Sequence, residues 1–540
     1  MERASLETMN TVAFLSSLPI SLSQSHPRHR VFSGQACIPV RQYYDHYRIV
    51  RRGRAPHRYM PFQSPAVAPT ALLADWLLSN KATINENLVL TPTDSRSKLG
   101  IYLAKSGKGV LKNTELASFP ESVFLSSKTA RSSLEAEVSA LKQWSGADDL
   151  APASWIALQL LYERAKGDGS SVAPLIKSIP GPGELDAATL WPSEQLEWLK
   201  GSLVHDRLLE IAGGVLEEWE KINSEVGNQL FQAPQADFSL DLYRWAIALV
   251  DARSSSVSSG KELIFAPVAS QMNTAVSPSS RLETGSAGMF FSSKRKVKLV
   301  SQQELQPADE LTLYAGASVR NADLLVERGT ILPNSSANTV EMVFALTTMD
   351  RFYEDKVEIL EQYGDDCGIP SQAPAAFDLA ATDTAVWEPP EMLDVYLRLL
   401  CLGTGDAFLL ESVFRSEIWD HLSLPISPDN EKAVCDTIIG ACEDALDGYV
   451  MSEDSGYDGD AADTVAAQRW AMAKGLVAAE RDILRRTVQA YKRRAASLDV
   501  IEYYAERRLK ALDLLRPVDE SEIVDAESGA RVGRAFDENY

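Results

Sequence analysis

The sequence predicts an α+β protein in which two strand-rich stretches enclose a helical one and a second helical region follows. Residues 97–127 alternate short apolar runs with glycine-containing turns, and residues 261–315 do so again. Between them, residues 130–245 carry apolar side chains at spacings of three and four, which is typical of amphipathic helices. The chain after Pro333 is largely helical by the same criterion. A length of 540 residues predicts about two to four domains.

Composition and charge restrict the class of partner. The chain has a formal net charge of −22, so its average surface repels nucleic acid and anionic membranes. Five cysteines are scattered without a C-x-x-C pair, which argues against a zinc cluster or a disulfide framework and favours a reducing compartment. Four of the six histidines lie within the first 57 residues, which leaves few for catalysis. We therefore expect no metal, no direct nucleic-acid partner and no membrane partner.

The first 65 residues have the composition of an organelle transit peptide. They contain the serine-rich stretch SSLPISLSQS and only three acidic residues. Their arginines include Arg28, Arg30, Arg41, Arg48, Arg51, Arg52, Arg54 and Arg58. A start rich in arginine and serine and poor in acids is typical of such targeting segments, and the alternative is a disordered tail without a targeting role. The apolar run Val12–Leu18 is too short to span a membrane.

The second strand-rich stretch combines strands, a loop and a short helix in a recognisable order. Ile264–Val268 is an apolar run interrupted by Pro267, which indicates a strand edge or the entry to a loop. Residues 311–315 alternate apolar and polar side chains, the pattern of a half-buried strand. Asn321 can cap the helix that follows, and Gly329 can end it.

This order of elements resembles the C-terminal half of a SET domain, in particular that of the plant and algal proteins typified by the Rubisco large-subunit lysine methyltransferase. The loop PVASQMNTA, the turn YAG, the helix NADLL and the ending RGT stand in the family's order. Upstream, SKLG resembles the opening of a SET domain, and LWPSEQLEWLKGS resembles the helical insert that splits the domain in this family. The helix FSLDLYRWAIALVDAR resembles the one that leads into the second half, with matches at Trp245, Ala246 and Arg253.

The resemblance implies a SET-domain β-clip core that is split by a helical insert and followed by an all-α C-terminal lobe. We expect a transit peptide or disordered segment at 1–65 and a SET domain at 66–335, with its insert at about 131–245. A helical substrate-binding-like domain is expected at 336–517 and an acidic tail at 518–540. The lobe would dock a protein substrate or partner, and the sequence predicts no oligomeric state.

The resemblance also implies an activity, that of an S-adenosyl-L-methionine-dependent protein-lysine N-methyltransferase in the plastid stroma. Such a site must align a neutral amine with the methyl carbon, and desolvation favours the uncharged amine. It must also surround a sulfonium with aromatic and carbonyl groups. Tyr314 would orient the amine as the catalytic residue. The residues implied to hold the cofactor are Leu99, Gly100, Arg253, Asn273 and Thr274.

Four positions depart from the family pattern. Lys98 replaces a glycine, Thr274 a histidine, and Ala315 and Arg328 replace tyrosines. Lys98 and Arg328 would bring cations toward a site that must exclude charge. With Ala315 at the tyrosine position, Tyr314 lies one residue earlier and would point to the other strand face. These substitutions leave open a second function, that of a catalytically inactive SET-fold scaffold or interaction subunit of a plastid assembly such as the transcription machinery.

Two charged stretches near the C-terminus each have an ordinary and a functional interpretation. The acidic stretch MSEDSGYDGDAAD lacks the ligand spacing and closing glutamate of an EF-hand, which favours a solvated loop over a calcium site. The long helix after it has a basic end, which is either solvated or a docking patch for an acidic partner. This basic end consists of Arg485, Arg486, Lys492, Arg493 and Arg494.

Overall fold

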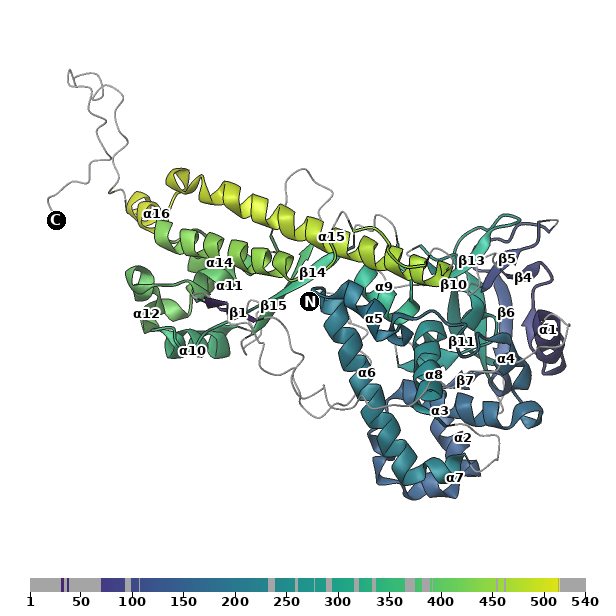
Figure 1. Ribbon diagram of the computed structural model, residues 1–540. Helices are drawn as coiled ribbons and strands as arrows, with labels where there is room; N and C mark the ends of the chain where they lie inside the picture. Colours follow the sequence, from purple (N-terminus) through teal and green to yellow (C-terminus); the bar gives the residue numbers. More distant parts are fainter. Residues whose placement is uncertain are drawn as a thin grey trace, which may run out of the picture. The chain divides into compact units, whose positions relative to one another are not determined.

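The computed structural model divides into two compact units (Figure 1). It describes residues 31–33, 36–37, 69–92, 99–105, 107–231, 238–257, 261–275, 277–287, 294–314, 320–332, 337–364, 374–380, 389–390, 392–452, 455–460, 463–512 and 514. The first unit holds the described residues from 69 to 340 and those from 445 to 483. The second holds residues 31–33 and 36–37, the described residues from 341 to 444 and those after 483.

The strands of the first unit form three small sheets. Their orders are β10-β13-β5-β4, β11-β12-β6-β3 and β7-β9-β8. The strands before the helical insert are β3 (Thr83–Ile84), β4 (Leu88–Pro92), β5 (Leu99–Leu103), β6 (Glu115–Pro120) and β7 (Leu125–Ser126). Those after it are β8 (Ser255–Val257), β9 (Glu262–Phe265), β10 (Asn273–Ala275), β11 (Ser280–Ala287), β12 (Lys294–Ser301) and β13 (Glu310–Tyr314).

Each sheet joins strands from both sides of the insert. β13 pairs with β5, β12 with β6, and β9 with β7, all antiparallel. Their inward side chains form one apolar core that includes Ile101, Phe119, Val297 and Leu311, each fully buried. Because burial of this core requires both halves of the chain, the strands expected before and after the insert form one structural body.

The insert consists of helices packed on the strand core. They are α2 (Ala130–Glu137), α3 (Pro152–Ala165), α4 (Ala173–Ser178), α5 (Ser193–Leu196), α6 (Leu203–Ile222), α7 (Asn228–Leu230) and α8 (Leu240–Arg253), and α1 (Pro69–Ser79) precedes them. Ser202 and Ser239 cap α6 and α8 by accepting backbone N–H bonds with their hydroxyls. Helix α3 packs against α8 (Figure 1), and it also contacts β9. The spacing of apolar residues thus predicted the helices of this region correctly.

Helix α9 (Asn321–Arg328) begins differently from the prediction. Its cap residue is Arg320, which makes no capping hydrogen bond with its side chain, and Asn321 is the first helical residue. The buried Asn321 side chain instead binds both backbone groups of Leu332, accepting from N–H at 2.7 Å and donating to the carbonyl at 3.0 Å. The prediction of Asn321 as cap is therefore wrong, because its amide closes the loop after the helix. Gly329 ends the helix with φ 63°, as predicted.

The second unit is mainly helical but also contains a sheet of order β15-β14-β1-β2. Its strands are β1 (Val31–Ser33), β2 (Ala36–Cys37), β14 (Thr339–Ala345) and β15 (Ala375–Ala380). Its helices are α10 (Tyr353–Tyr363), α11 (Leu393–Leu400), α12 (Ser412–Arg415), α13 (Ile418–Leu422) and α16 (Tyr504–Ala511). The strand β14 and the helices α14 (Pro428–Asp447) and α15 (Thr464–Ala495) contribute residues to both units.

The sheet of the second unit was not expected from the sequence. The C-terminal lobe was predicted to be helical throughout, and residues 1–65 to be a leader without a fold. The short strands β1 and β2 lie in that leader, and β1 pairs in parallel with β14, for example Phe32 with Phe344. An isolated run of three residues carries too little pattern to be recognised before its partner strand is known. The other leader residues lie outside the described part of the chain.

Two absences concern the described residues alone. None of the helices there combines the length and the apolar character needed to cross a lipid bilayer. The same part of the chain brings together no group of histidine, cysteine and acidic side chains suited to a metal ion.

Candidate functional site

The predicted cofactor residues lie on neighbouring strands of one sheet. Strand β10 pairs in parallel with β13, which places Asn273 beside Thr312, Thr274 beside Leu313 and Ala275 beside Tyr314. On its other side β13 pairs with β5, the strand that contains Leu99 and Gly100. The sheet order therefore brings together segments that are more than 150 residues apart in the sequence.

Gly100 is buried and covered by the ring of Tyr102 from its own strand. A Cβ added at Gly100 would lie 2.7 Å from Cε2 of that ring and 3.0 Å from its hydroxyl oxygen. Residues two apart on a strand share a face, so an added Cβ would displace the tyrosine ring, a side chain that can move. Sequence reasoning missed Tyr102, although the spacing of two from Gly100 was available as a signal.

Asn273 uses its side chain to hold Glu310 at the start of β13. The Asn273 Nδ2 atom donates to Glu310 Oε1 at 2.6 Å. Burial raises the pKa of Tyr102, and the Glu310 carboxylate adds to this effect. Tyr102, Glu310 and Asn273 thus form a polar group across β5, β13 and β10, and sequence reasoning named only its asparagine. The backbone of Asn273 and Thr274 is not engaged by this contact.

Two arginines meet at the C-terminal end of α8. Arg253, the last residue of α8, donates from Nη1 to the Met272 carbonyl at 3.4 Å, just before β10. Arg328, the last residue of α9, donates from Nη1 to the carbonyl of Ala252. Burial lowers the pKa of Arg253 to about 10, and the positive charge of Arg328 contributes. Burial also lowers the pKa of Arg328.

Several buried polar atoms on the segments next to Arg253 and Met272 have no hydrogen-bond partner among the described residues. They are Asp251 Oδ1, Ser254 Oγ, Ser270 Oγ and Gln271 Oε1. Burial raises the pKa of Asp251 to about 7, and the charge of Glu327 adds to this effect. Buried polar groups in native proteins are nearly always paired, and each exception calls for an explanation such as a bound molecule. These atoms lie on the end of α8 and on the loop that leads into β10.

The loop between β9 and β10 also stores backbone strain. Val268 is buried and has φ 66°, a left-handed conformation that a β-branched residue rarely adopts. The short 3-10 helix Ala269–Gln271 follows directly and leads to Met272 and Asn273. Strained residues of this kind cluster at active sites and ligand-binding loops. The strain supports the choice of this loop as part of the site.

The structure tests the proximity of the predicted residues but leaves their roles as predictions. Leu99, Gly100, Asn273, Thr274 and Tyr314 share one sheet, and Arg253 touches the residue before Asn273. Lys98 and Ala315 lie outside the described residues, as do the side chains of Leu99 and Tyr314. The expected position of the Tyr314 hydroxyl therefore remains a prediction.

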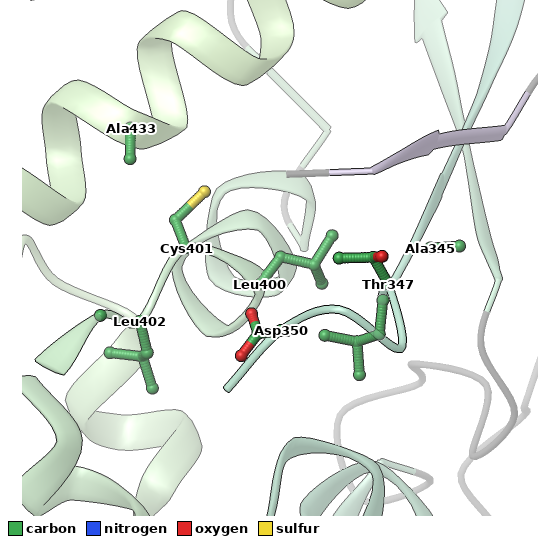
Figure 2. A pocket seen from close by; sticks show the side chains of 9 residues that line it. Ala345, Thr347, Asp350, Leu400, Cys401, Leu402 and Ala433 are labelled. Atoms are coloured by element: carbon green, nitrogen blue, oxygen red, sulfur yellow. The ribbon is translucent and has the colours of Figure 1, made fainter. Parts of the chain in front are cut away.

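A small cavity in the second unit is not a candidate for catalysis. It has a volume of about 80 Å³ and is lined by Ala345, Leu346, Thr347, Asp350, Leu400, Cys401, Leu402, Gly403 and Ala433 (Figure 2). The fully buried Lys356 next to it donates from Nζ to Asp350 Oδ2 at 2.7 Å and to two backbone carbonyls at 2.8 and 2.9 Å. Burial raises the pKa of Cys401 to about 11, so its thiol stays protonated and is a poor nucleophile.

The basic end of α15 is partly used inside the protein. Arg494 pairs with Asp394 at 2.6 Å and with the fully buried Glu431, which also binds Arg398 at 2.6 Å. Lys492 pairs with a surface glutamate at 2.7 Å. A charge that is bound in the interior cannot dock an acidic partner. Arg494 is therefore not available to a docking patch at this helix end.

Comparison with known proteins identifies first the class and then the family. The chain matches the solved structure of the SET domain of LSMT bound to lysine and AdoHcy with a TM-score of 0.68 at 25% identity. The match covers 85% of this chain and 98% of that one. A family model described as Rubisco LSMT substrate-binding matches residues 347–484. The protein is therefore a SET-domain protein with a helical C-terminal part, and the predicted fold class is confirmed.

Two curated relatives are plastid enzymes by name. The chloroplastic ribulose-1,5 bisphosphate carboxylase/oxygenase large subunit N-methyltransferase of Nicotiana tabacum is 31% identical over 376 residues, which covers 67% of this chain and 72% of the relative. The chloroplastic [fructose-bisphosphate aldolase]-lysine N-methyltransferase of Arabidopsis thaliana is 29% identical over 370 residues, with 67% and 73% covered. This chain belongs to the family of Rubisco large-subunit N-methyltransferases. The predicted family is confirmed, and protein-lysine N-methyltransferase, the predicted enzyme class, is the class of that family.

Proposed function

We propose that this protein is a protein-lysine N-methyltransferase that uses S-adenosyl-L-methionine. One observation on this chain supports the proposal. Arg253, partly buried at the end of α8, forms no ion pair with a described residue, and the neighbouring segments carry unpartnered buried polar atoms. A guanidinium that is partly removed from water is stabilised by a nearby anion. The carboxylate of the cofactor's amino-acid tail has the right charge, so the residues present fit the cofactor at this end.

Each proposed site residue has a role that follows from its place. S-adenosyl-L-methionine supplies the methyl group, which is attached to a sulfonium. Arg253 binds the carboxylate, and the backbone of Leu99, Gly100, Asn273 and Thr274 lines the cofactor. Tyr314 orients the incoming amine. Strands β5, β10 and β13 hold these residues in fixed register, which restricts the approach of the amine to one direction.

We infer a protein substrate in the plastid stroma. The relatives named above act on a Rubisco subunit and on an aldolase and are named chloroplastic. The family model in residues 347–484 carries a substrate-binding description, so the second part of the chain is proposed to dock the protein whose lysine is methylated. The transit peptide at 1–65, the SET domain at 66–335 and the lobe at 336–517 remain predictions within this proposal.

A second function, that of an inactive scaffold in a plastid assembly, has specific observations in its favour. The ring of Tyr102 lies over Gly100, where a cofactor would have to approach the backbone. The side chain of Asn273 is bound to Glu310. Arg328 stands where the family has a tyrosine. These features predict weak or absent cofactor binding.

Equilibrium binding of S-adenosyl-L-methionine to the full-length chain, measured by calorimetry, separates the two functions. The enzyme predicts micromolar affinity, weakened about 10-fold or more by Arg253→Met because a charge-assisted contact is lost. Asn273→Ala tests whether strand β10 contributes to cofactor binding. Lys432→Met is the control, because Lys432 is a largely exposed cation in an exposed ion pair. No binding at millimolar ligand by a chain shown to be folded by circular dichroism would exclude the enzyme and favour the scaffold.

A further inference from the structure

We propose that Arg328 acts with Arg253 as a two-guanidinium receptor for the carboxylate of the cofactor's amino-acid tail. This inference rests on the proposed function and deepens it. It assigns a specificity-determining role to a residue that departs from the family pattern. It predicts that the chain discriminates strongly between nucleosides with and without that carboxylate.

The geometry brings both side chains to one place. Helix α9 packs against α8, and Arg328 reaches from the end of α9 to the carbonyl of Ala252, the residue before Arg253. Arg253 in turn reaches the Met272 carbonyl in front of β10. Each guanidinium has five N–H donors, and the described residues accept from only one nitrogen of each. Each guanidinium thus has donors beyond the one that binds a described carbonyl, and the proposal assigns these to one anion.

The carboxylates that face this pair offset its charge only in part, through the electrostatic attraction of Asp251 and Glu327 to Arg328. Asp251 and Glu327 are its nearest acidic neighbours along the chain, and neither forms an ion pair with Arg253 or Arg328 among the described residues. Burial raises the pKa of both carboxyls, so their negative charge is itself disfavoured. Glu218, which faces Asp251 from α6, is bound to a tyrosine hydroxyl. The two guanidiniums therefore carry positive charge that no nearby group offsets fully.

Two guanidinium groups bind a planar carboxylate better than a single cation does. Guanidinium groups bind carboxylates in a bidentate manner, and two of them can engage both oxygens. The unpartnered hydroxyls belong to Ser254, the residue after Arg253, and to Ser270, two residues before Met272, and both can donate a hydrogen bond. An anion between the arginines also removes their mutual repulsion, since each charge opposes the other in the interior. The second arginine thus strengthens carboxylate binding more than nucleoside binding.

The test compares two ligands on the full-length protein by calorimetry. S-adenosyl-L-homocysteine has the amino-acid tail, and 5′-methylthioadenosine lacks it. Arg328→Gln removes the charge but keeps a donor for the Ala252 carbonyl, and Lys432→Met is the matched surface control. We expect Arg328→Gln to weaken the affinity for S-adenosyl-L-homocysteine about 10- to 100-fold. The affinity for methylthioadenosine should stay within about 3-fold of the wild-type value.

The wild-type chain gives a second test that needs no variant. At constant ionic strength, acetate should compete with S-adenosyl-L-homocysteine and leave methylthioadenosine binding unchanged. Equal effects of Arg328→Gln on both ligands would overturn the inference but not the proposed function. Tighter binding of S-adenosyl-L-homocysteine by the variant would also overturn it, because Arg328 would then obstruct the site. Failure of the wild-type chain to bind either ligand would overturn both.

Discussion

At the scale of single residues, buried polar side chains join segments that are distant in sequence. Glu480 of α15 lies in the interior of the first unit and accepts from Ser202 Oγ and from the Tyr449 hydroxyl, both at 2.9 Å. The same Ser202 hydroxyl caps α6. Burial raises the pKa of Glu480 to about 7 from the ordinary value of 4.5. The carboxyl is therefore held partly protonated at neutral pH.

This shift predicts a pH-dependent stability that Glu480→Gln removes. The folded state binds the proton more tightly than the unfolded state, so the stabilisation is complete below about pH 4.5 and is lost as the pH rises through about 7. The loss amounts to at most about 1.4 kcal/mol per pH unit. We expect the glutamine variant, compared with wild type in urea unfolding, to gain relative stability from pH 5 to pH 8. A constant difference across this range would contradict the assigned pKa.

At the scale of elements, the end of α9 is determined by close backbone packing. Gly329 has φ 63°, and a Cβ added there would lie 1.7 Å from the carbonyl oxygen of Asp186 in the insert. Backbone cannot move aside as a flexible side chain can. Two separate features therefore require a glycine at this position: its left-handed backbone conformation and its close contact with the segment before Trp191. This position determines where Arg328, the preceding residue, enters the site.

Gly329→Ala is expected to lower the free energy of unfolding by at least about 3 kcal/mol, since strain and overpacking add. Gly213→Ala is the matched control, because Gly213 lies within α6 and an added Cβ there meets nothing within 4 Å. That control should stabilise the protein by about 0.5–1 kcal/mol. Urea unfolding monitored by circular dichroism measures both. A neutral Gly329→Ala would show that the contact with the insert relaxes at little cost.

At the scale of the whole molecule, the two units differ in what a ligand should do to them. The proposed cofactor residues all belong to the first unit, because β5, β10, β13, α8 and α9 lie within it. A ligand that binds only the folded state stabilises it according to its affinity and concentration. The second unit contains the Lys356 and Glu431 clusters and none of the proposed cofactor residues.

S-adenosyl-L-homocysteine at about 100 times its dissociation constant should therefore stabilise the first unit by about 2.7 kcal/mol. Hydrogen exchange with mass spectrometry locates the effect. We expect protection in peptides from β5, β10 and β13 and unchanged exchange in peptides from α11 to α13. Arg253→Met should reduce the protection at the same ligand concentration, to about 1.4 kcal/mol for a 10-fold weaker affinity. Protection confined to the second unit would contradict the assignment of the site.

The sequence by itself determined the order of strands, insert and helical region, and it identified the family. Periodic apolar spacing and glycine positions are local signals, and they located α3, α6, α8 and the end of α9. It also named Arg253, Asn273 and Gly100 through motif resemblance. Motifs are local in the same sense, since each consists of residues a few positions apart.

Only the tertiary structure decided how these residues are used. Asn321 binds Leu332 instead of capping its helix, Tyr102 covers Gly100, and Arg328 meets Arg253. Arg494, expected at a basic surface, is bound to a buried glutamate. Each of these outcomes depends on contacts between segments brought together by strand pairing and core burial. A side chain's partner follows from the free energy of the whole fold, which no local pattern of residues contains.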